Sequence, residues 1–258
     1  HDGFVCSPVG RLEPALAIAA CRAGARGILE LSAKAHPTEI QSAIASIQKH
    51  AGRFGVRLGK GISLPDSCRP TWVTLDGDAT PEALTAARGF GAEVFVEAIS
   101  LAEAVRATEL GVDGIILKGN EAGGRVGPTS SFILVQAWRN WADRHARATP
   151  FWVHGGIGPN AAAAVVAAGG RGVVLDSQLL LARESPLGEE LRHKIRGCDG
   201  GETTAIGERL GAGYRVYARA DSPAVAEIAA EEERLLHSDA TPEERRTQWQ
   251  SLVESRVT

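Results

Sequence analysis

The stretch "VRATELGVDGIILKG", residues 105–119, decides the fold because it contains one complete repeating unit of the chain. An amphipathic run ends at Gly111, where the left-handed residue after a helix belongs. A short polar segment follows, and then an apolar run that ends at Lys118. This second run is too short for a helix and rich in Ile and Leu, as is typical of a strand buried on both faces. The stretch therefore predicts a helix followed by a buried strand.

The same unit occurs again as "AACRAGARGILELS" (19–32), "LTAARGFGAEVFVEA" (84–98) and "AVVAAGGRGVVLDS" (164–177). The glycines expected to follow the four helices are Gly24, Gly91, Gly111 and Gly170. A helix followed by a strand, repeated along the chain, predicts βα units and a parallel sheet.

Strand candidates and helix candidates alternate along most of the chain. The candidate strands are 3–9, 26–32, 53–59, 71–77, 92–98, 113–119, 150–156 and 172–177. The candidate helices are 14–23, 37–51, 81–89, 100–110, 129–146 and 159–168. Eight strands alternating with helices over about 180 residues predict an α/β fold, a (β/α)8 TIM barrel. Residues 60–70, "KGISLPDSCRP", are too short and proline-rich for a full helix, so a doubly wound open sheet is the competing fold.

The barrel pattern ends near residue 185. We therefore expect a barrel domain over 1–185 and a C-terminal α/β extension over 186–258, either accessory or a linker to a following domain. Within it, "GYRVYARAD" (213–221) predicts a strand. Residues 222–236 predict a helix capped by Ser222, and Thr241 is a second capping signal.

Composition excludes several function classes. The net charge is −3, so we expect no nucleic-acid partner and no attraction to anionic membranes. The apolar runs are far too short to span a bilayer, and no signal peptide is visible. The four cysteines have no metal-ligand or C-x-x-C spacing, which favours a reduced, cytoplasmic setting and no metal. The chain lacks methionine and starts with "HDGFVCSP", which fits a segment of a longer polypeptide better than a complete gene product.

Polar residues stand at the ends of the predicted strands, where a barrel places its chemistry. They are Ser7, which Pro8 follows, Glu30, Arg57, Asp76, Glu97, Lys118, His154 and Asp176. Each one alone is equally well explained as a solvated or ion-paired strand end. Together they predict a polar pocket at the mouth of the barrel.

The stretch "HGGIGPNAAAAVV" (154–166) predicts a phosphate cradle after the seventh strand. Its glycines, Gly155, Gly156 and Gly158, leave backbone N–H groups free to face an anion at a helix N-terminus. Ser177, after the last strand, is a further candidate donor. Asp176 opposes this reading unless its side chain points away from the ligand, and a tight turn would also explain the glycines.

Three stretches resemble the nitronate monooxygenases and the related flavin-dependent enoyl reductases. They are "GVDGIILKGNEAGGRVG" (111–127), "PFWVHGGIG" (150–158) and "GVVLDSQLLL" (172–181). Residues 7–31 are similar to the first βα unit of that family, and the resemblance covers about residues 3–185.

The resemblance implies a TIM barrel that binds FMN noncovalently. The backbone of Pro8, Val9 and Gly10 is then expected against the flavin ring, with Lys118 reaching it. Gly123 and Gly124 are expected to let the chain pass close to cofactor and substrate. The phosphate is assigned to Gly155, Gly156, Gly158 and Ser177, and a nicotinamide, NADH or NADPH, is the expected reductant.

Three residues depart from the family pattern. Arg125 stands where the family has a histidine after "EAGG", Arg57 replaces an asparagine, and Asp176 replaces a glycine. Because arginine stays protonated, it cannot act as the base of nitronate oxidation. We predict that Arg125 instead holds negative charge on a substrate; pairing with Glu121 or Asp176 would only rigidify its loop. His154 is a second catalytic candidate, for proton transfer, although it would also suit a hydrogen bond to the neighbouring loop.

Three functions are compatible with these residues. The first is an FMN-dependent oxidoreductase, oxidase-like or an enoyl-thioester reductase, acting on a small molecule or an acyl thioester. By resemblance, it would stand beside other domains of a polyketide or fatty-acid synthase. The second is a flavin-less structural barrel within such a synthase. The third is a phosphosugar enzyme whose glycine loop binds substrate phosphate.

Overall fold

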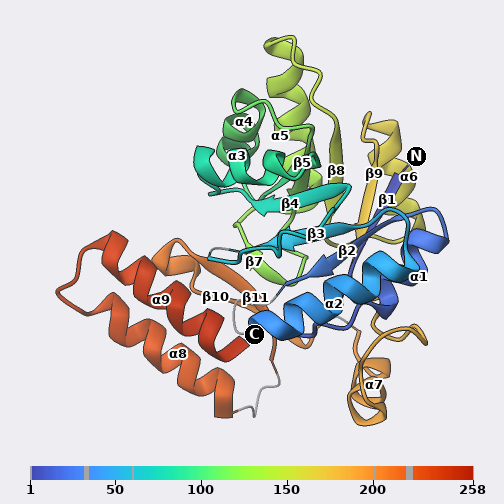
Figure 1. Cartoon of the computed structure of the whole chain (residues 1–258). Coiled ribbons are helices and arrows are strands. Elements are labelled where there is room, and N and C mark those ends of the chain that lie inside the picture. Colours follow the sequence, from blue (N-terminus) through green and yellow to red (C-terminus); the bar gives the residue numbers. More distant parts are fainter. Residues whose placement is uncertain (1, 32–34, 60, 200, 219–222, 258) are drawn as a thin grey trace.

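A computed structural model of the chain describes residues 2–31, 35–59, 61–199, 201–218 and 223–257. Eight parallel strands close into a barrel in the order β1-β2-β3-β4-β5-β6-β8-β9 (Figure 1). They are β1 (Asp2–Cys6), β2 (Arg26–Glu30), β3 (Gly55–Leu58), β4 (Trp72–Asp76), β5 (Glu93–Ala98), β6 (Gly114–Lys118), β8 (Phe151–His154) and β9 (Gly172–Leu175). The pairing of β9 with β1 closes the ring, which confirms the barrel and excludes the open sheet.

Helices pack around the barrel at the predicted places. They are α1 (Ala15–Arg22), α2 (Pro37–His50), α3 (Pro81–Gly89), α4 (Leu101–Glu109), α5 (Ser131–Arg144) and α6 (Pro159–Ala167). Thr80, Ser100 and Ser130 cap three of them by accepting a backbone N–H with the side chain. Between β3 and β4, residues 61–70 form turns and no helix, as their prolines predict.

One predicted helix end lies a residue away from its observed place. Gly24, Gly91 and Gly111 adopt positive φ after their helices, but after α6 this residue is Gly169, not Gly170. Gly170 packs instead against Val165, whose Cγ1 would lie 2.6 Å from a Cβ at that position. The two adjacent glycines thus have different roles: Gly169 ends the helix, and Gly170 allows close packing.

Side chains inside the barrel form two layers because they alternate along each strand. The lower layer is apolar and includes Phe4, Phe95 and Trp152, whose rings meet edge to face with centroids 5.1–5.3 Å apart. The Arg26 guanidinium lies over these rings and pairs with Asp2 and Glu93. Two residues further along each strand, the side chains of the upper layer are mostly polar.

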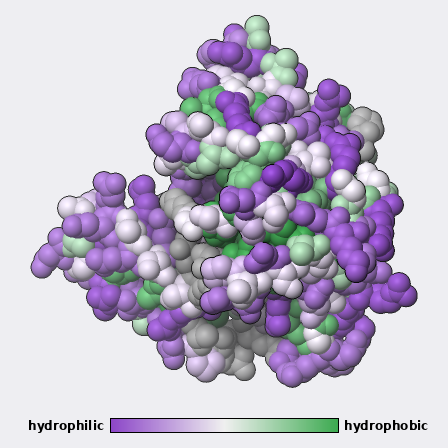
Figure 2. Space-filling model, in the orientation of Figure 1, coloured by the Kyte–Doolittle hydropathy of each residue, from purple (hydrophilic) through white to green (hydrophobic). Residues whose placement is uncertain are grey.

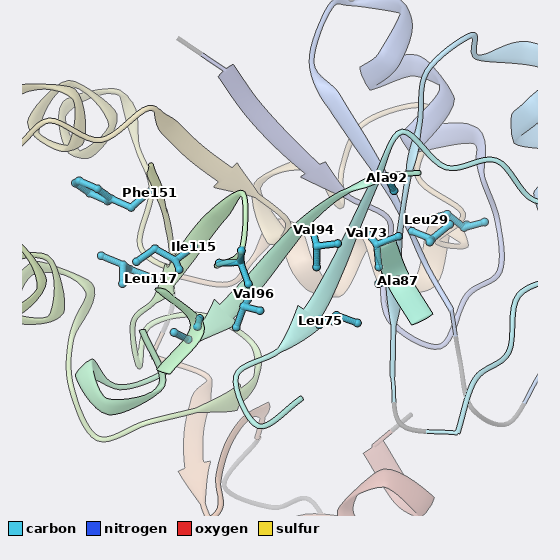
Figure 3. Close-up of a cluster of buried hydrophobic side chains, with 14 of the residues drawn as sticks. Leu29, Val73, Leu75, Ala87, Ala92, Val94, Val96, Ile115, Leu117 and Phe151 are labelled. Carbon is cyan, nitrogen blue, oxygen red and sulfur yellow. The ribbon is translucent and has the colours of Figure 1, made fainter. Parts of the chain in front are cut away.

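The outward side chains of the strands form the main core against the helices. Figure 3 shows part of it, with Val73, Val94 and Ile115 on three successive barrel strands. Because both faces of each strand are buried, the strands consist of the continuous apolar runs that are seen in the sequence.

A second, smaller sheet lies beside the barrel. It is antiparallel, in the order β10 (Thr203–Ile206), β11 (Gly213–Tyr217) and β7 (Gly124–Val126). The rest of the C-terminal region comprises η1 (Ser177–Leu179), α7 (Glu189–Arg196), η2 (Glu208–Leu210), α8 (Pro223–Leu236) and α9 (Pro242–Val257). Figure 2 shows α8 and α9 as a largely hydrophilic lobe beside the barrel.

The C-terminal elements were predicted in part. The strand β11 and the two helices are where the sequence places them, and Thr241 caps α9 by accepting the Glu244 N–H at 3.3 Å. Ser222 lies outside the described residues. Trp249 on α9 is fully buried and donates to the Ala212 carbonyl oxygen at 2.9 Å. The division at residue 185 remains our proposal, since β7 comes from the first part of the chain and pairs with β11 of the second.

Candidate active site at the barrel mouth

The polar upper layer gathers at the C-terminal mouth of the barrel, as predicted. We call it the mouth network; it comprises Glu30, Arg57, Asp76, Glu97, Lys118, His154 and Asp176. Along its own strand, each of these residues lies two positions after a residue of the lower layer, or at or next to the C-terminal end of the strand. Strand periodicity therefore brings seven separate strand ends into one contiguous cluster of charge.

Glu97 is the centre of the mouth network. Its Oε1 accepts from Lys118 Nζ at 2.9 Å and pairs with Arg57 Nη2 at 2.8 Å, and its Oε2 lies 3.0 Å from His154 Nδ1. Burial opposes ionisation of this carboxyl, but the cations of Arg57 and Lys118 and the His154 hydrogen bond hold its pKa well below the usual range. One buried carboxylate thus satisfies three basic groups.

Arg57 ties three acidic strand ends together. Besides Glu97, it reaches Asp76 at 2.5 Å and Glu30 at 3.6 Å. Burial, together with the neighbouring carboxylates, raises the pKa of Glu30 to about 7. Arg57 therefore serves as an internal counter-ion within the barrel.

The acid Glu30 should make stability depend on pH. Its pKa rises on folding, so its contribution is complete below about pH 4.5 and is lost as the pH rises towards 7. The raised pKa of His154 acts in the same direction above pH 6.5. We expect the free energy of unfolding to fall by on the order of 3 kcal/mol between pH 5 and 8.

Urea denaturation across this pH range tests the expectation. Glu30→Gln should flatten the pH dependence and raise stability at pH 8, whereas Glu109→Gln on the exposed surface of α4 should leave the profile unchanged. A profile that is equally steep in wild type and Glu30→Gln would show that Glu30 is not the source.

His154 is held between two carboxylates. Its Nδ1 lies 3.0 Å from Glu97 Oε2 and its Nε2 2.8 Å from Asp176 Oδ2, and the side chain is almost fully buried. Burial lowers its pKa, but the hydrogen bonds to Asp176 and Glu97 outweigh this and raise it. Both nitrogens face carboxylate oxygens, an arrangement that a protonated imidazole satisfies with its two N–H groups, and its role in proton transfer remains a prediction.

The Asp176 carboxylate accepts hydrogen bonds from Ser177, whose donors the sequence analysis assigns to a phosphate. Its Oδ1 accepts from the Ser177 backbone N–H at 2.5 Å and from Ser177 Oγ at 3.1 Å. Despite burial, the hydrogen bond and charge of His154 lower the pKa of Asp176 to about 2. The carboxylate points towards the site, not away from it, so Ser177 has its donors engaged by the chain itself.

The glycine loop after β8 has the backbone geometry of an anion cradle. Gly155 and Gly156 have φ values of 108° and 66°, and Gly158 is the N-cap of α6, where no side chain makes a capping hydrogen bond. Pro159 follows at the first helical position. The first-turn N–H groups of α6 are thus directed at the mouth without a capping side chain.

The loop after β6 packs directly on this cradle. The Gly119 N–H donates to the His154 carbonyl oxygen at 2.9 Å, and a Cβ at Gly155 would lie 3.0 Å from the Ala122 nitrogen. A Cβ at Gly119 would collide with Glu121 and Ser131, and one at Gly127 with the Ile99 carbonyl. Two of the four glycines in this loop, Gly119 and Gly127, are therefore required by the packing of the chain itself.

Gly123 and Gly124 remain candidates for close approach to a ligand. A Cβ at Gly123 would meet no atom within 4 Å, and one at Gly124 would lie 3.9 Å from Lys118 Nζ. Lys118 itself is buried and bonded to Glu97, so its amine faces the interior of the mouth network. Their roles in cofactor binding remain predictions.

Arg125 pairs with a residue that sequence reasoning missed. Its Nη1 lies 3.3 Å from Glu103 Oε2 and its Nη2 contacts Oε1. Glu121 and Asp176, the partners in the alternative interpretation of the sequence, make other contacts: Glu121 binds Ser131, and Asp176 binds His154 and Ser177. Glu103 lies on the first turn of α4, three residues after Ser100, and this capping-box spacing marks a helix start but not a partner of Arg125.

The turn after β1 forms an exposed edge of the mouth. The Arg11 N–H donates to the Pro8 carbonyl at 3.3 Å, Val9 is 58% exposed, and Gly10 has a φ of 74°. An exposed apolar residue at the end of a barrel strand suits contact with a flat ring, as the resemblance implies.

The residues present fit a flavin phosphate in part. The glycine loop supplies an N-terminal helix turn without a capping side chain, whereas Ser177 offers no spare donor. A cavity of about 10 Å³ lies beside β4 and α4 and has Asp76 of the mouth network among its lining residues. A groove of about 310 Å³ is lined by residues of α7 and β11 and of the segment between them. Among the described residues no helix is both long and apolar enough to cross a bilayer.

Solved structures with a similar fold include FabK from Thermotoga maritima, which is 23% identical with a TM-score of 0.77 over 92% of this chain and 78% of that one. Nitroalkane oxidase from Streptomyces ansochromogenes is 22% identical, with a TM-score of 0.68 over 84% and 77%. The enoyl reductase domain of MlnA, from the macrolactin biosynthesis cluster of Bacillus amyloliquefaciens, is 14% identical, with a TM-score of 0.70 over 92% and 68%.

The sequence itself places the chain in a family. A comparison with curated proteins gives no significant match. The family model "Nitronate monooxygenase" matches residues 53–216, which is more than half of the chain and includes the loops after β6 and β8. The chain therefore belongs to the nitronate monooxygenase family of oxidoreductases.

Proposed function

We propose that the chain is an FMN-dependent oxidoreductase that reduces an activated alkene, such as an enoyl thioester, rather than oxidising neutral nitroalkanes. The observation that carries this proposal is the replacement of the family base by Arg125, a permanent cation beside a mouth whose histidine has a carboxylate oxygen at each ring nitrogen. Reduction of an enoyl thioester develops negative charge on the carbonyl oxygen, which cations stabilise. Oxidation of a nitroalkane needs a base, and Arg125 cannot supply one.

Each part of the mouth has a proposed role. The glycine loop 155–158 and the first turn of α6 would hold the FMN phosphate, and the turn at Pro8, Val9 and Gly10 would contact the ring. When bound, the flavin would accept hydride from a nicotinamide and transfer it to the alkene. Lys118 and Glu97, which are hydrogen-bonded to each other, would give a bound flavin a polar and charge-paired surface.

Glu103 fixes the direction of Arg125. Two guanidinium nitrogens bind the Glu103 carboxylate, and the remaining N–H groups stay available to a substrate oxygen. The pair is only partly buried, with side-chain exposures of 19% for both residues, so it lies at the edge that a substrate can reach. A guanidinium held in one direction is a preorganised oxyanion donor.

We expect Arg125→Ala to lose about 2–4 kcal/mol of transition-state stabilisation, the size of one oxyanion donor. Steady-state reduction of a short trans-2-enoyl thioester by the FMN-loaded protein measures this as a fall in kcat. Glu103→Gln, which removes the counter-charge but keeps Arg125, should cost much less. Unchanged turnover in Arg125→Ala, or vigorous nitroalkane oxidation by the wild type, would refute the role of Arg125.

A direct binding measurement tests the proposal as a whole. Calorimetric titration of the purified protein with FMN should show saturable binding, and the complex should then be reduced by NADH or NADPH. If the protein takes up no FMN, the alternative is a flavin-less structural barrel, which the self-contained pairing of the mouth network favours.

The wider setting is also a proposal. The similarity to an enoyl reductase domain from a macrolactin biosynthesis cluster supports a place beside other domains of a polyketide or fatty-acid synthase, with an acyl thioester as substrate. The four free cysteines favour the reducing cytoplasm.

A further inference from the structure

One charged group of the mouth has no role in the proposed function, and this group is the carboxylate of Asp176. Asp176 stands at the end of β9, next to β8 in the sheet, where Val174 is paired with His154. Its carboxylate accepts both Ser177 donors on one oxygen and contacts His154 on the other. Loops at the ends of these two strands are where barrels commonly bind phosphate.

Gln178 ties this carboxylate turn to the glycine loop. Its Oε1 accepts the Asp176 N–H at 3.0 Å, and its Nε2 donates to the Ile157 carbonyl oxygen at 3.0 Å. The Ser177 donors and the loop that ends at Gly158 are therefore held side by side around one position. Asp176 brings a negative charge to that position before any ligand arrives.

We propose that Asp176 is a specificity residue that selects against the 5′-phosphate of the flavin, so that FMN has little or no advantage over riboflavin. A phosphate on the glycine loop would find the Ser177 donors occupied and would meet a carboxylate of the same sign. The ring and ribityl chain carry no such conflict. This inference rests on the proposed flavin function and concerns which flavin the same site takes.

Titration of flavin fluorescence with the purified protein tests the inference. Wild-type protein should bind FMN and riboflavin with dissociation constants within about threefold of each other. Asp176→Gly removes both the charge and the competing acceptor, so FMN affinity should rise at least about tenfold while riboflavin affinity stays the same. Asp176→Asn keeps an acceptor oxygen near Ser177 and removes the charge, so it should give a smaller gain.

The control is Asp143→Asn, an exposed aspartate on α5 that pairs with Arg139. It should leave both affinities unchanged. Wild-type protein that prefers FMN over riboflavin tenfold or more, or an FMN-to-riboflavin ratio that does not move in Asp176→Gly, would overturn the inference and leave the flavin function standing. Failure of every variant to bind either flavin would overturn both. The wild-type ratio decides the question even if the variants fold poorly.

Discussion

Replacing Glu97 with glutamine should lower the free energy of unfolding by about 3–5 kcal/mol, because breaking a buried ion pair from one side leaves its partners uncompensated. Here three basic groups lose their shared carboxylate: Arg57, Lys118 and His154. The glutamine is nearly the same size, so a packing defect would not explain a loss of this magnitude.

Urea denaturation at constant pH measures the effect. Glu93→Gln is the matched control, since Glu93 stands on the same strand, pairs with Arg26, and is 44% exposed. Surface pairs of that kind contribute about 0–1 kcal/mol. Equal effects of the two substitutions would show that the mouth network does not stabilise the barrel.

Replacing Gly156 with aspartate should lower the affinity for FMN by at least about 100-fold. The position has a φ of 66°, which an aspartate adopts only with strain, and the new carboxylate would stand at the uncapped start of α6, where the anion belongs. A Cβ there would also lie 3.6 Å from the Glu121 Cβ, beside a second carboxylate.

The titration that checks this uses Gly52→Asp as a control. Gly52 precedes β3 at the opposite face of the barrel, and a Cβ there would meet no atom within 4 Å. It should bind flavin as the wild type does. Tight binding of FMN by Gly156→Asp would show that the glycine loop does not hold the phosphate.

Most of the fold was accessible from the sequence because its signals are local. A strand buried on both faces and a helix closed by glycine can each be recognised within a few residues, as in the segment 105–119. The strand β7 was missed for the opposite reason: its three residues are stabilised by pairing with β11, about ninety positions later in the chain.

The sequence predicted which positions lie at the site, but not which side chains contact one another there. Strand ends such as Glu97 and His154 could be collected from the barrel pattern, but their partners could not. Which acid faces Arg125 depends on how α4 lies against β7, and the spacing of Glu103 from Ser100 signals only a helix start. The direction of the Asp176 side chain depends on one backbone turn at Ser177. Such contacts come from tertiary geometry, which periodicity does not encode.

The pairing of β7 with β11 has a consequence for how this barrel can change over time. The loop that carries Arg125 is hydrogen-bonded along Gly124–Val126 to a strand of the C-terminal extension, so the two segments share one sheet. Recombination that exchanged the barrel without the extension would leave β7 as an unpaired edge beside the mouth. We therefore expect the loop and the extension to be inherited together, and a chimera to need both from the same parent.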